Sequence, residues 1–168
     1  MRILGIDPGS HRLGWGIIDS HGSKLVHVAS GTLRAVASQA LPQRLHALYD
    51  GLEALLLAHR PEVAAIETLY HDKNAQSVFV LAQARGAILL ALARAQLGIS
   101  EYSPGQIKRA ATGRGNSDKL QVQAMVQRLL ALPAKPAMGA DTSDALACAL
   151  CHAQFAPMNT RLQGMVAP

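Results

Sequence analysis

The sequence has few of the features that mark secreted or membrane proteins. Cys148 and Cys151 are its only cysteines, which is too few for a disulfide framework. No apolar run approaches the roughly 20 residues that a membrane-spanning helix needs. The N-terminus leads straight into an apolar run, without the basic region and small-residue cleavage site of a signal peptide. We therefore expect a protein of the reducing cytoplasm with no membrane segment.

Internal repeats, low-complexity tracts and domain linkers are also lacking. The 168 residues are 49% hydrophobic, which is enough to bury a core and typical of one globular domain. We predict that residues 1–156 form this domain. Residues 157–168 carry no periodic pattern, so we expect them to be a flexible tail.

Acidic residues are in the minority. The chain has 16 Lys and Arg against 11 Asp and Glu, a net charge of +5 and a pI near 9.6. A basic excess of this size favours a polyanionic partner, and nucleic acid is the first candidate.

The apolar pattern predicts an α/β fold. Three closely spaced apolar runs near the N-terminus indicate an antiparallel meander, and a short buried strand (EVAAIE) and a last strand (GISEYS) follow later. The predicted strands are 2–7, 13–19, 24–34, 62–67 and 98–103. Apolar residues at helical spacing predict helices at 42–60, 74–97, 104–112, 117–131 and 141–155. This order predicts a mixed sheet with helices packed on its faces.

The predicted helix 74–97 is apolar nearly all round. A helix of that kind must be covered on more than one face. One side can lie on the sheet, and the other needs a second cover such as a partner subunit.

Four acids occupy positions where a carboxylate is notable. Asp7 and Glu67 each end an apolar strand, and a carboxylate there needs a cation or hydrogen bonds. Asp141 and Asp144 open the last helix on one side of its first turn. Gathered in one cluster, four negative charges repel, and a pair of divalent cations would relieve the repulsion. Oxygen ligands favour Mg²⁺ or Mn²⁺, and two such ions about 3.5–4 Å apart suit in-line displacement at phosphorus.

Each acid also has a purely structural interpretation. Asp7 could be the first residue of an Asp-Pro-Gly turn, and Glu67 could emerge into solvent at a strand end. Asp141 and Asp144 could be a helix cap and a first-turn acid that complements the helix dipole. The functional interpretation therefore depends on the four acids acting together.

The charge balance supports that joint interpretation. Setting the four acids aside leaves seven acids against sixteen bases, so the rest of the chain carries +9. A metal-dependent nuclease needs this arrangement, because bases hold phosphates and acids hold metals. If the first two strands pair, Gly14 and Gly16 lie near Asp7 and leave room for a metal or a backbone segment to approach. Their alternative role is only to form a turn or a bulge.

Several motifs, in order over residues 2–155, resemble the RuvC family of Holliday junction resolvases. They read "LGIDPGS…GWGII", "AIE", "KNAQSVFVLAQARGAI", "QIKRAATGRG", "KLQVQAMV" and "DTSDALACAL". The resemblance implies a ribonuclease-H-like fold with a five-stranded mixed sheet flanked by helices. It also implies a homodimer that binds four-way DNA junctions and nicks two strands of like polarity in recombination and repair. The RuvA–RuvB branch-migration complex is a partner by resemblance only.

The resemblance also implies which residues act. It places two Mg²⁺ ions, with Mn²⁺ as a substitute, on Asp7, Glu67, Asp141 and Asp144. The two-metal chemistry would leave 5′-phosphate and 3′-hydroxyl ends, and helix 74–97 matches the family's dimer helix.

Basic residues near the acids are candidate DNA contacts. Lys108, Arg109, Arg114 and Lys119 lie within twelve positions, although such a run could be only a solvated face. Lys119 falls in the first turn of a predicted helix, where the helix dipole disfavours a cation. A bound phosphate would satisfy both the lysine and the N-terminus of the helix. The resemblance places Lys108 and Lys119 near the scissile phosphate, and "GRGNS" (113–117) resembles a mobile DNA-contacting loop.

Further candidates surround Glu67. Tyr70 matches a family aromatic, more often Phe, that can stack on a base at the crossover, and its alternative role is packing at a helix entrance. Lys73 and Asn74 match the family pattern beside it, and Arg85 is a further candidate phosphate contact.

The motif CxxC at 148–151 could suggest a metal site. It offers two ligands where structural zinc needs four, so we interpret both cysteines as buried small hydrophobes. Three rivals to a junction nuclease remain: a YqgF-like ribonuclease, a junction-binding protein without catalysis, and an actin-like ATPase. YqgF-like chains lack the "KNAQS…LAQARG" helix that is present here. The four intact acids argue against a junction-binding protein without catalysis. An actin-like ATPase uses two such domains around its nucleotide, and one is present here.

Overall fold

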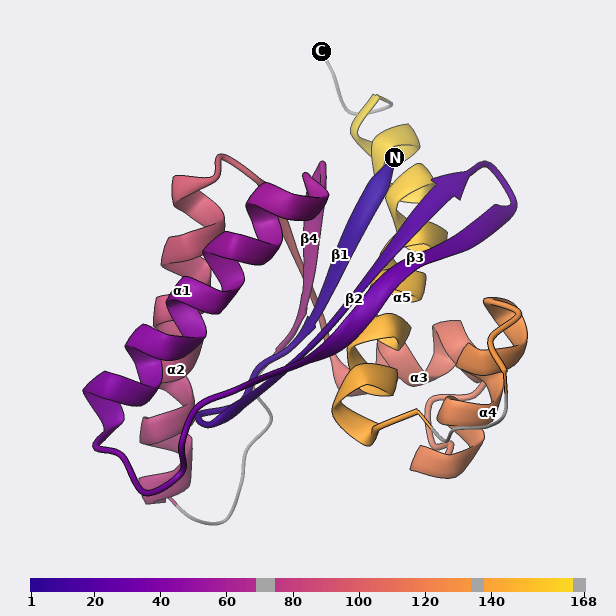
Figure 1. The fold of residues 1–168 in the computed structure, drawn as a ribbon. Helices are drawn as coiled ribbons and strands as arrows, with labels where there is room; N and C mark the ends of the chain where they lie inside the picture. The colour runs from indigo at the N-terminus through magenta and orange to yellow at the C-terminus, as the bar shows by residue number, and fades with distance from the viewer. Residues whose placement is uncertain (69–74, 134–137, 165–168) are drawn as a thin grey trace.

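The structure, a computed structural model, describes residues 1–68, 75–133 and 138–164, with side chains as far as Phe155. Its centre is a five-stranded sheet of order β3-β2-β1-β4-β5 (Figure 1). The strands are β1 (Arg2–Asp7), β2 (Arg12–His21), β3 (Lys24–Arg34), β4 (Val63–Glu67) and β5 (Gly98–Tyr102). β1, β2 and β3 pair antiparallel, whereas β4 lies parallel to β1 and β5 parallel to β4. The predicted meander and mixed sheet are confirmed.

Helices cover both faces of the sheet (Figure 1). Those in the described ranges are α1 (Leu41–His59), α2 (Ala75–Arg94), α3 (Pro104–Thr112), α4 (Lys119–Leu129) and α5 (Ala140–Gly164). α1 and α2 lie on one face, and α5 lies on the other with α3 and α4 packed beside it.

The two faces of the sheet bury two separate cores. β1 is buried on both sides because Leu4 and Ile6 face α1 and α2, while Ile3 packs with α5. A strand covered on both faces has no polar side to show, which explains its near-continuous apolar sequence. Consequently the polar residue that ends it, Asp7, marks the edge of the core.

The ends of α3 and α4 follow from local sequence. Ser103 and Asp118 are their N-caps, and each forms a capping box with the glutamine three residues later, Gln106 and Gln121. These caps satisfy backbone N–H groups that would otherwise lack partners. The cap at Asp118 places Lys119 at the first position of α4.

The largest difference from prediction lies at the C-terminus. α5 continues to Gly164, whereas the sequence pattern predicts a helix ending at 155 and a flexible tail from 157. Pro157 removes one backbone donor, but the residues after it include Met, Arg, Leu and Gln, which favour helix. That residues 1–156 form one independent domain stays a prediction.

Among the residues that the structure describes, one face of α2 is left exposed. Ile88 and Leu92 are buried against the sheet side, while Phe79 is 68% and Leu90 57% exposed. By length and composition alone α2 would suit a membrane span, with a mean hydropathy of 1.5. Its sequence is not an uninterrupted apolar run, because Gln83 and Arg85 lie within it, and 28% of the window is buried inside the protein.

Candidate active site

The four acids are brought to one edge of the sheet by three elements. Asp7 ends β1 and Glu67 ends β4, and these neighbouring parallel strands place Ile6 beside Ile66 in register. Their carboxyl ends therefore meet at the same edge. Asp141 lies in the first turn of α5 and Asp144 three residues later, and this helix packs directly on β1 and β2.

Strand alternation turns the acids toward α5. Gly5 faces the α5 backbone, and Asp7, two residues on, lies on the same face. Ala65 belongs to the core beneath α5, which places Glu67 on that face too. The predicted cluster of strand-end and helix-start acids is thus brought together by the fold.

The electrostatics of Asp7 and Glu67 show that their charges are poorly compensated. Burial raises the pKa of Asp7 to about 7, and neighbouring carboxylates add to the rise; in decreasing order of effect these are Asp144, Glu67 and Asp141. Burial also raises the pKa of Glu67, followed by the charge of Asp144. Both directions are those expected for carboxylates that share a partly desolvated site without a cation.

The donor set fits a divalent cation. Four carboxylates supply hard oxygen ligands, and the raised pKa of Asp7 shows negative charge that lacks a counter-ion. In the part of the chain that the structure describes, no group of three or more acidic, histidine or cysteine side chains lies close enough together to hold a metal ion. The four acids nevertheless share one electrostatic neighbourhood, because Asp144, Glu67 and Asp141 all raise the pKa of Asp7.

Two lysines face this neighbourhood. Lys119 Nζ lies 3.5 Å from Asp144 Oδ2, at the first position of α4. The positive charge of Lys119, and then that of Lys108 on α3, opposes the rise in the pKa of Glu67. The two lysines therefore lie near the acids, whereas Arg109 and Arg114 are exposed residues of α3 and of the loop after it.

The 113–117 segment is organised by short polar contacts. The Thr112 and Ser117 hydroxyl groups lie 2.7 Å apart, and the Arg114 N–H donates to Thr112 Oγ1 at 3.2 Å. Ser117 is buried. The mobility of segment 113–117 and its contact with DNA stay predictions.

Gly14 and Gly16 allow α5 to approach the sheet. A Cβ atom at Gly14 would lie 2.1 Å from the Asp141 carbonyl oxygen, and one at Gly16 would lie 2.5 Å from the Leu146 side chain. The prediction that a backbone segment approaches these glycines is confirmed. The space they leave sets the height of the acidic end of α5 above β1.

We expect Gly14→Ala to displace the start of α5. The added methyl group meets backbone rather than a flexible side chain, so the free energy of unfolding should fall by about 1–3 kcal/mol. Gly98→Ala is the matched control, because its Cβ would meet only Val63 at an ordinary 3.9 Å. Urea unfolding of both variants checks this, and equal stabilities would show that α5 is not held against Gly14.

Other predicted residues fall elsewhere. Tyr70, Lys73 and Asn74 lie outside the described residues. Arg85 is only 8% exposed; it donates a hydrogen bond to the Glu67 backbone carbonyl and forms a 2.8 Å ion pair with Glu101. The structure thus describes Arg85 as a buried residue behind the end of β4, and its contact with a phosphate stays a prediction.

The cysteines and one histidine belong to the core under the site. Cys148 and Cys151 are fully buried, as predicted, and burial raises the pKa of Cys151 to about 12. Tyr102 Oη lies 2.9 Å from His152 Nδ1 in a buried contact between β5 and α5. Sequence reasoning missed this pair; its one signal is a tyrosine that ends the strand beside Glu67.

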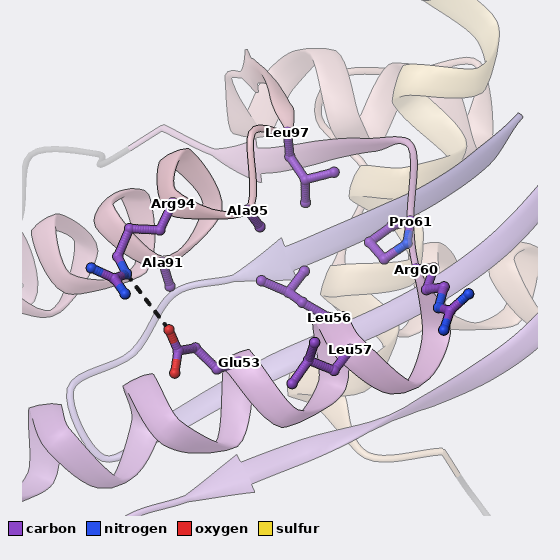
Figure 2. A pocket seen from close by; sticks show the side chains of 9 residues that line it. All are labelled: Glu53, Leu56, Leu57, Arg60, Pro61, Ala91, Arg94, Ala95 and Leu97. Atoms are coloured by element: carbon purple, nitrogen blue, oxygen red, sulfur yellow. Dashed lines mark ion pairs between the residues drawn. The ribbon is translucent and has the colours of Figure 1, made fainter.

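A pocket of about 500 Å³ lies at the opposite edge of the parallel strands (Figure 2). Leu56, Pro61 and Leu97 line it, and Arg94 forms an ion pair with Glu53 at 3.7 Å beside it. Pro61 and Leu97 precede β4 and β5, whereas Glu67 ends β4. The pocket therefore lies at the other end of these strands from the acid cluster.

Comparison with known proteins decides the family. The family model for crossover junction endodeoxyribonuclease RuvC matches residues 3–152. The chain belongs to the RuvC family. It is 50% identical to the RuvC of Bordetella petrii over 167 residues, covering 99% of this chain and 91% of that one. It is 44% identical to the RuvC of a Geobacter species over 98% of this chain and 99% of the other.

A solved RuvC structure shows the same fold. Thermus thermophilus RuvC in complex with a Holliday junction substrate superposes with a TM-score of 0.88 at 30% identity, covering 95% of this chain and 97% of that one. The ribonuclease-H-like α/β fold implied by the sequence motifs is confirmed. Membership in the RuvC family also decides against the YqgF-like and actin-like rivals.

Proposed function

We propose that this chain is a Holliday junction resolvase, a structure-selective endonuclease that cuts four-way DNA junctions in recombination and repair. The observation that carries the proposal is the convergence of Asp7 and Glu67 with Asp141 and Asp144 at one sheet edge, in a member of the RuvC family. The Thermus thermophilus relative, solved with a Holliday junction substrate, supports the choice of substrate.

The four acids would hold two Mg²⁺ ions, for which Mn²⁺ could substitute. When bound, these ions would supply an activated water and stabilise the leaving 3′ oxygen, so that products carry 5′-phosphate and 3′-hydroxyl ends. The protein's own part is to gather the carboxylates on one rigid edge. Lys119, at the N-terminus of α4, and Lys108 would bind the phosphate that the acids alone would repel.

The DNA would also contact Tyr70, Lys73, Asn74, Arg109 and Arg114. Excluding the four acids, the chain carries +9, which supports binding of phosphates around the acidic edge. Stacking of Tyr70 on a base at the crossover would favour junctions, because their bases are easier to unstack than those of a linear duplex.

The working unit would be a homodimer that acts in the cytoplasm. The uncovered face of α2, with exposed Phe79 and Leu90, supports a subunit interface. Two copies would place two acid clusters on one junction, which accounts for cuts in two strands of like polarity. The RuvA–RuvB complex would be a partner.

One assay tests this function. The protein is incubated with a labelled four-way junction, a linear duplex and single-stranded RNA, each with Mg²⁺, Mn²⁺ or EDTA. We expect paired nicks in the junction alone, and no cleavage in EDTA. Equal cleavage of the linear duplex would overturn junction selectivity, and binding without cleavage in either metal would favour a non-catalytic junction protein.

We expect Lys119→Ala and Asp118→Ala to separate catalysis from stability. Lys119→Ala removes a cation beside Asp144, so single-turnover cleavage should fall about 10-fold with little change in unfolding. Asp118→Ala removes the N-cap of α4, so the free energy of unfolding should fall by about 1 kcal/mol, with a smaller loss of cleavage. The reverse order of cleavage losses would remove Lys119 from the site.

A further inference from the structure

Arg85 is a buried cation in an otherwise apolar part of α2. It is 8% exposed, and Ala84 and Ile88 beside it are core residues. Burying a guanidinium is costly unless hydrogen bonds and an opposite charge compensate it. The bonds that Arg85 makes therefore indicate what the burial achieves.

Those bonds join α2 to the ends of two strands. Arg85 donates through Nη1 to the backbone carbonyl of Glu67, the last residue of β4. Its Nη2 lies 2.8 Å from Glu101 Oε2, on β5. Ile66 and Glu101 are register partners in the β4–β5 pair. One planar guanidinium thus bridges both strand ends, a geometry that a lysine cannot reproduce.

Arg85 approaches Glu67 from behind its carboxylate. The Glu67 side chain lies on the α5 face with the other acids, while Arg85 comes from α2 on the opposite face. On the α5 side, Tyr102, the register partner of Glu67, contacts His152, while within the sheet the Thr68 N–H donates to the Tyr102 carbonyl at 2.9 Å. The strand end that carries Glu67 is consequently held from both faces.

We propose that Arg85 is a positioning residue for Glu67: it fixes the end of β4 so that the Glu67 carboxylate meets the other acids, and it ties this end to α2. The proposal rests on the proposed function, because it assumes that Glu67 is a metal ligand. Groups behind a metal ligand set its orientation, and their loss typically lowers metal affinity about 10–100-fold.

The test measures metal binding without cleavage. Mn²⁺ is titrated into the DNA-free protein and followed by electron paramagnetic resonance, for wild type, Arg85→Lys, Arg85→Met and Asp7→Asn. We expect both Arg85 variants to weaken Mn²⁺ binding about 10-fold. Junction affinity in EDTA should stay within about twofold, because Arg85 is buried away from phosphates. Arg94→Lys, an exposed ion-paired position on the same helix, should leave both quantities unchanged.

Other outcomes overturn the proposal. If the Arg85 variants weaken junction binding in EDTA and leave Mn²⁺ binding intact, Arg85 is a phosphate contact. If only their melting temperature falls, its role is structural. If both Arg85 variants fail to fold, Glu101→Gln tests the same bridge at a half-exposed residue. We expect this variant to lose Mn²⁺ affinity about threefold, and an unchanged affinity would overturn the proposal.

The Asp7→Asn titration distinguishes this failure from failure of the proposed function. If Asp7→Asn weakens Mn²⁺ binding while the Arg85 variants do not, only the positioning role fails. If none of the variants changes Mn²⁺ binding, the proposed metal site itself is wrong.

Discussion

Replacing Asp7 by asparagine is expected to abolish junction cleavage while leaving junction binding in place. Asparagine keeps the shape of the side chain but removes the charge at the centre of the acid cluster, where three other carboxylates act on Asp7. Losing such a group should lower the single-turnover rate in Mg²⁺ on the order of 10³-fold. Binding depends on the basic remainder of the chain, so gel-shift affinity in EDTA should be equal or slightly tighter.

Asp19→Asn is the matched control for this experiment. Asp19 is also an aspartate of the sheet, but it lies on β2 beside the start of β1 and forms a 2.9 Å ion pair with Arg2. We expect it to retain cleavage. If Asp7→Asn keeps more than about a tenth of the wild-type rate, the acid cluster is not the catalytic centre.

The fold and the acids could be predicted from sequence because both depend on local patterns. Apolar runs separated by turns locate β1, β2 and β3, a short apolar run locates β4, and the segment GISEY after α2 forms β5. Asp7 and Glu67 end strands that are buried on both faces, and the ends of neighbouring parallel strands must meet. Their convergence with Asp141 then follows from α5 packing on that sheet.

The role of Arg85 could not be predicted in this way. The sequence shows a basic residue in an apolar helix, which is equally compatible with a surface contact and a buried bridge. Its direction depends on where α2 lies over β4 and β5, a long-range feature that residue spacing does not contain. The contact between Tyr102 and His152 is hidden for the same reason, since 50 residues separate the two partners.

The extent of α5 was mispredicted for a different reason. The residues from Pro157 onward show no helical periodicity, yet the structure continues the helix to Gly164. Proline removes one hydrogen bond, and the helix-favouring residues that follow can outweigh that loss. A local signal therefore predicts a probable boundary only where the surrounding sequence agrees with it.

The metal-free protein is expected to lose stability as the pH rises from about 4 to 8, and Asp7→Asn to remove much of that loss. The pKa of Asp7 is about 7 in the folded chain against an ordinary 3.8, so the folded state keeps a proton that the unfolded state has already released. The contribution of Asp7 to stability is therefore largest at low pH and is lost through this window. Asp7→Asn carries no such charge, and at pH 8 in EDTA we expect it to be more stable than wild type by roughly 2–4 kcal/mol.

Urea unfolding at pH 5, 6, 7 and 8 measures this difference directly. Saturating Mg²⁺ should stabilise the wild type at pH 8 and Asp7→Asn much less, because the ion binds the folded state through the same carboxylates. Asp19→Asn should instead be less stable than wild type at pH 8. The hydrogen bond from Arg2 lowers the pKa of Asp19, so the charged form of Asp19 favours the folded state. If Asp7→Asn is no more stable than wild type at pH 8 without metal, the carboxylate of Asp7 is already compensated within the protein. The acid cluster would then not require a cation, and the two-metal proposal would lose its electrostatic basis.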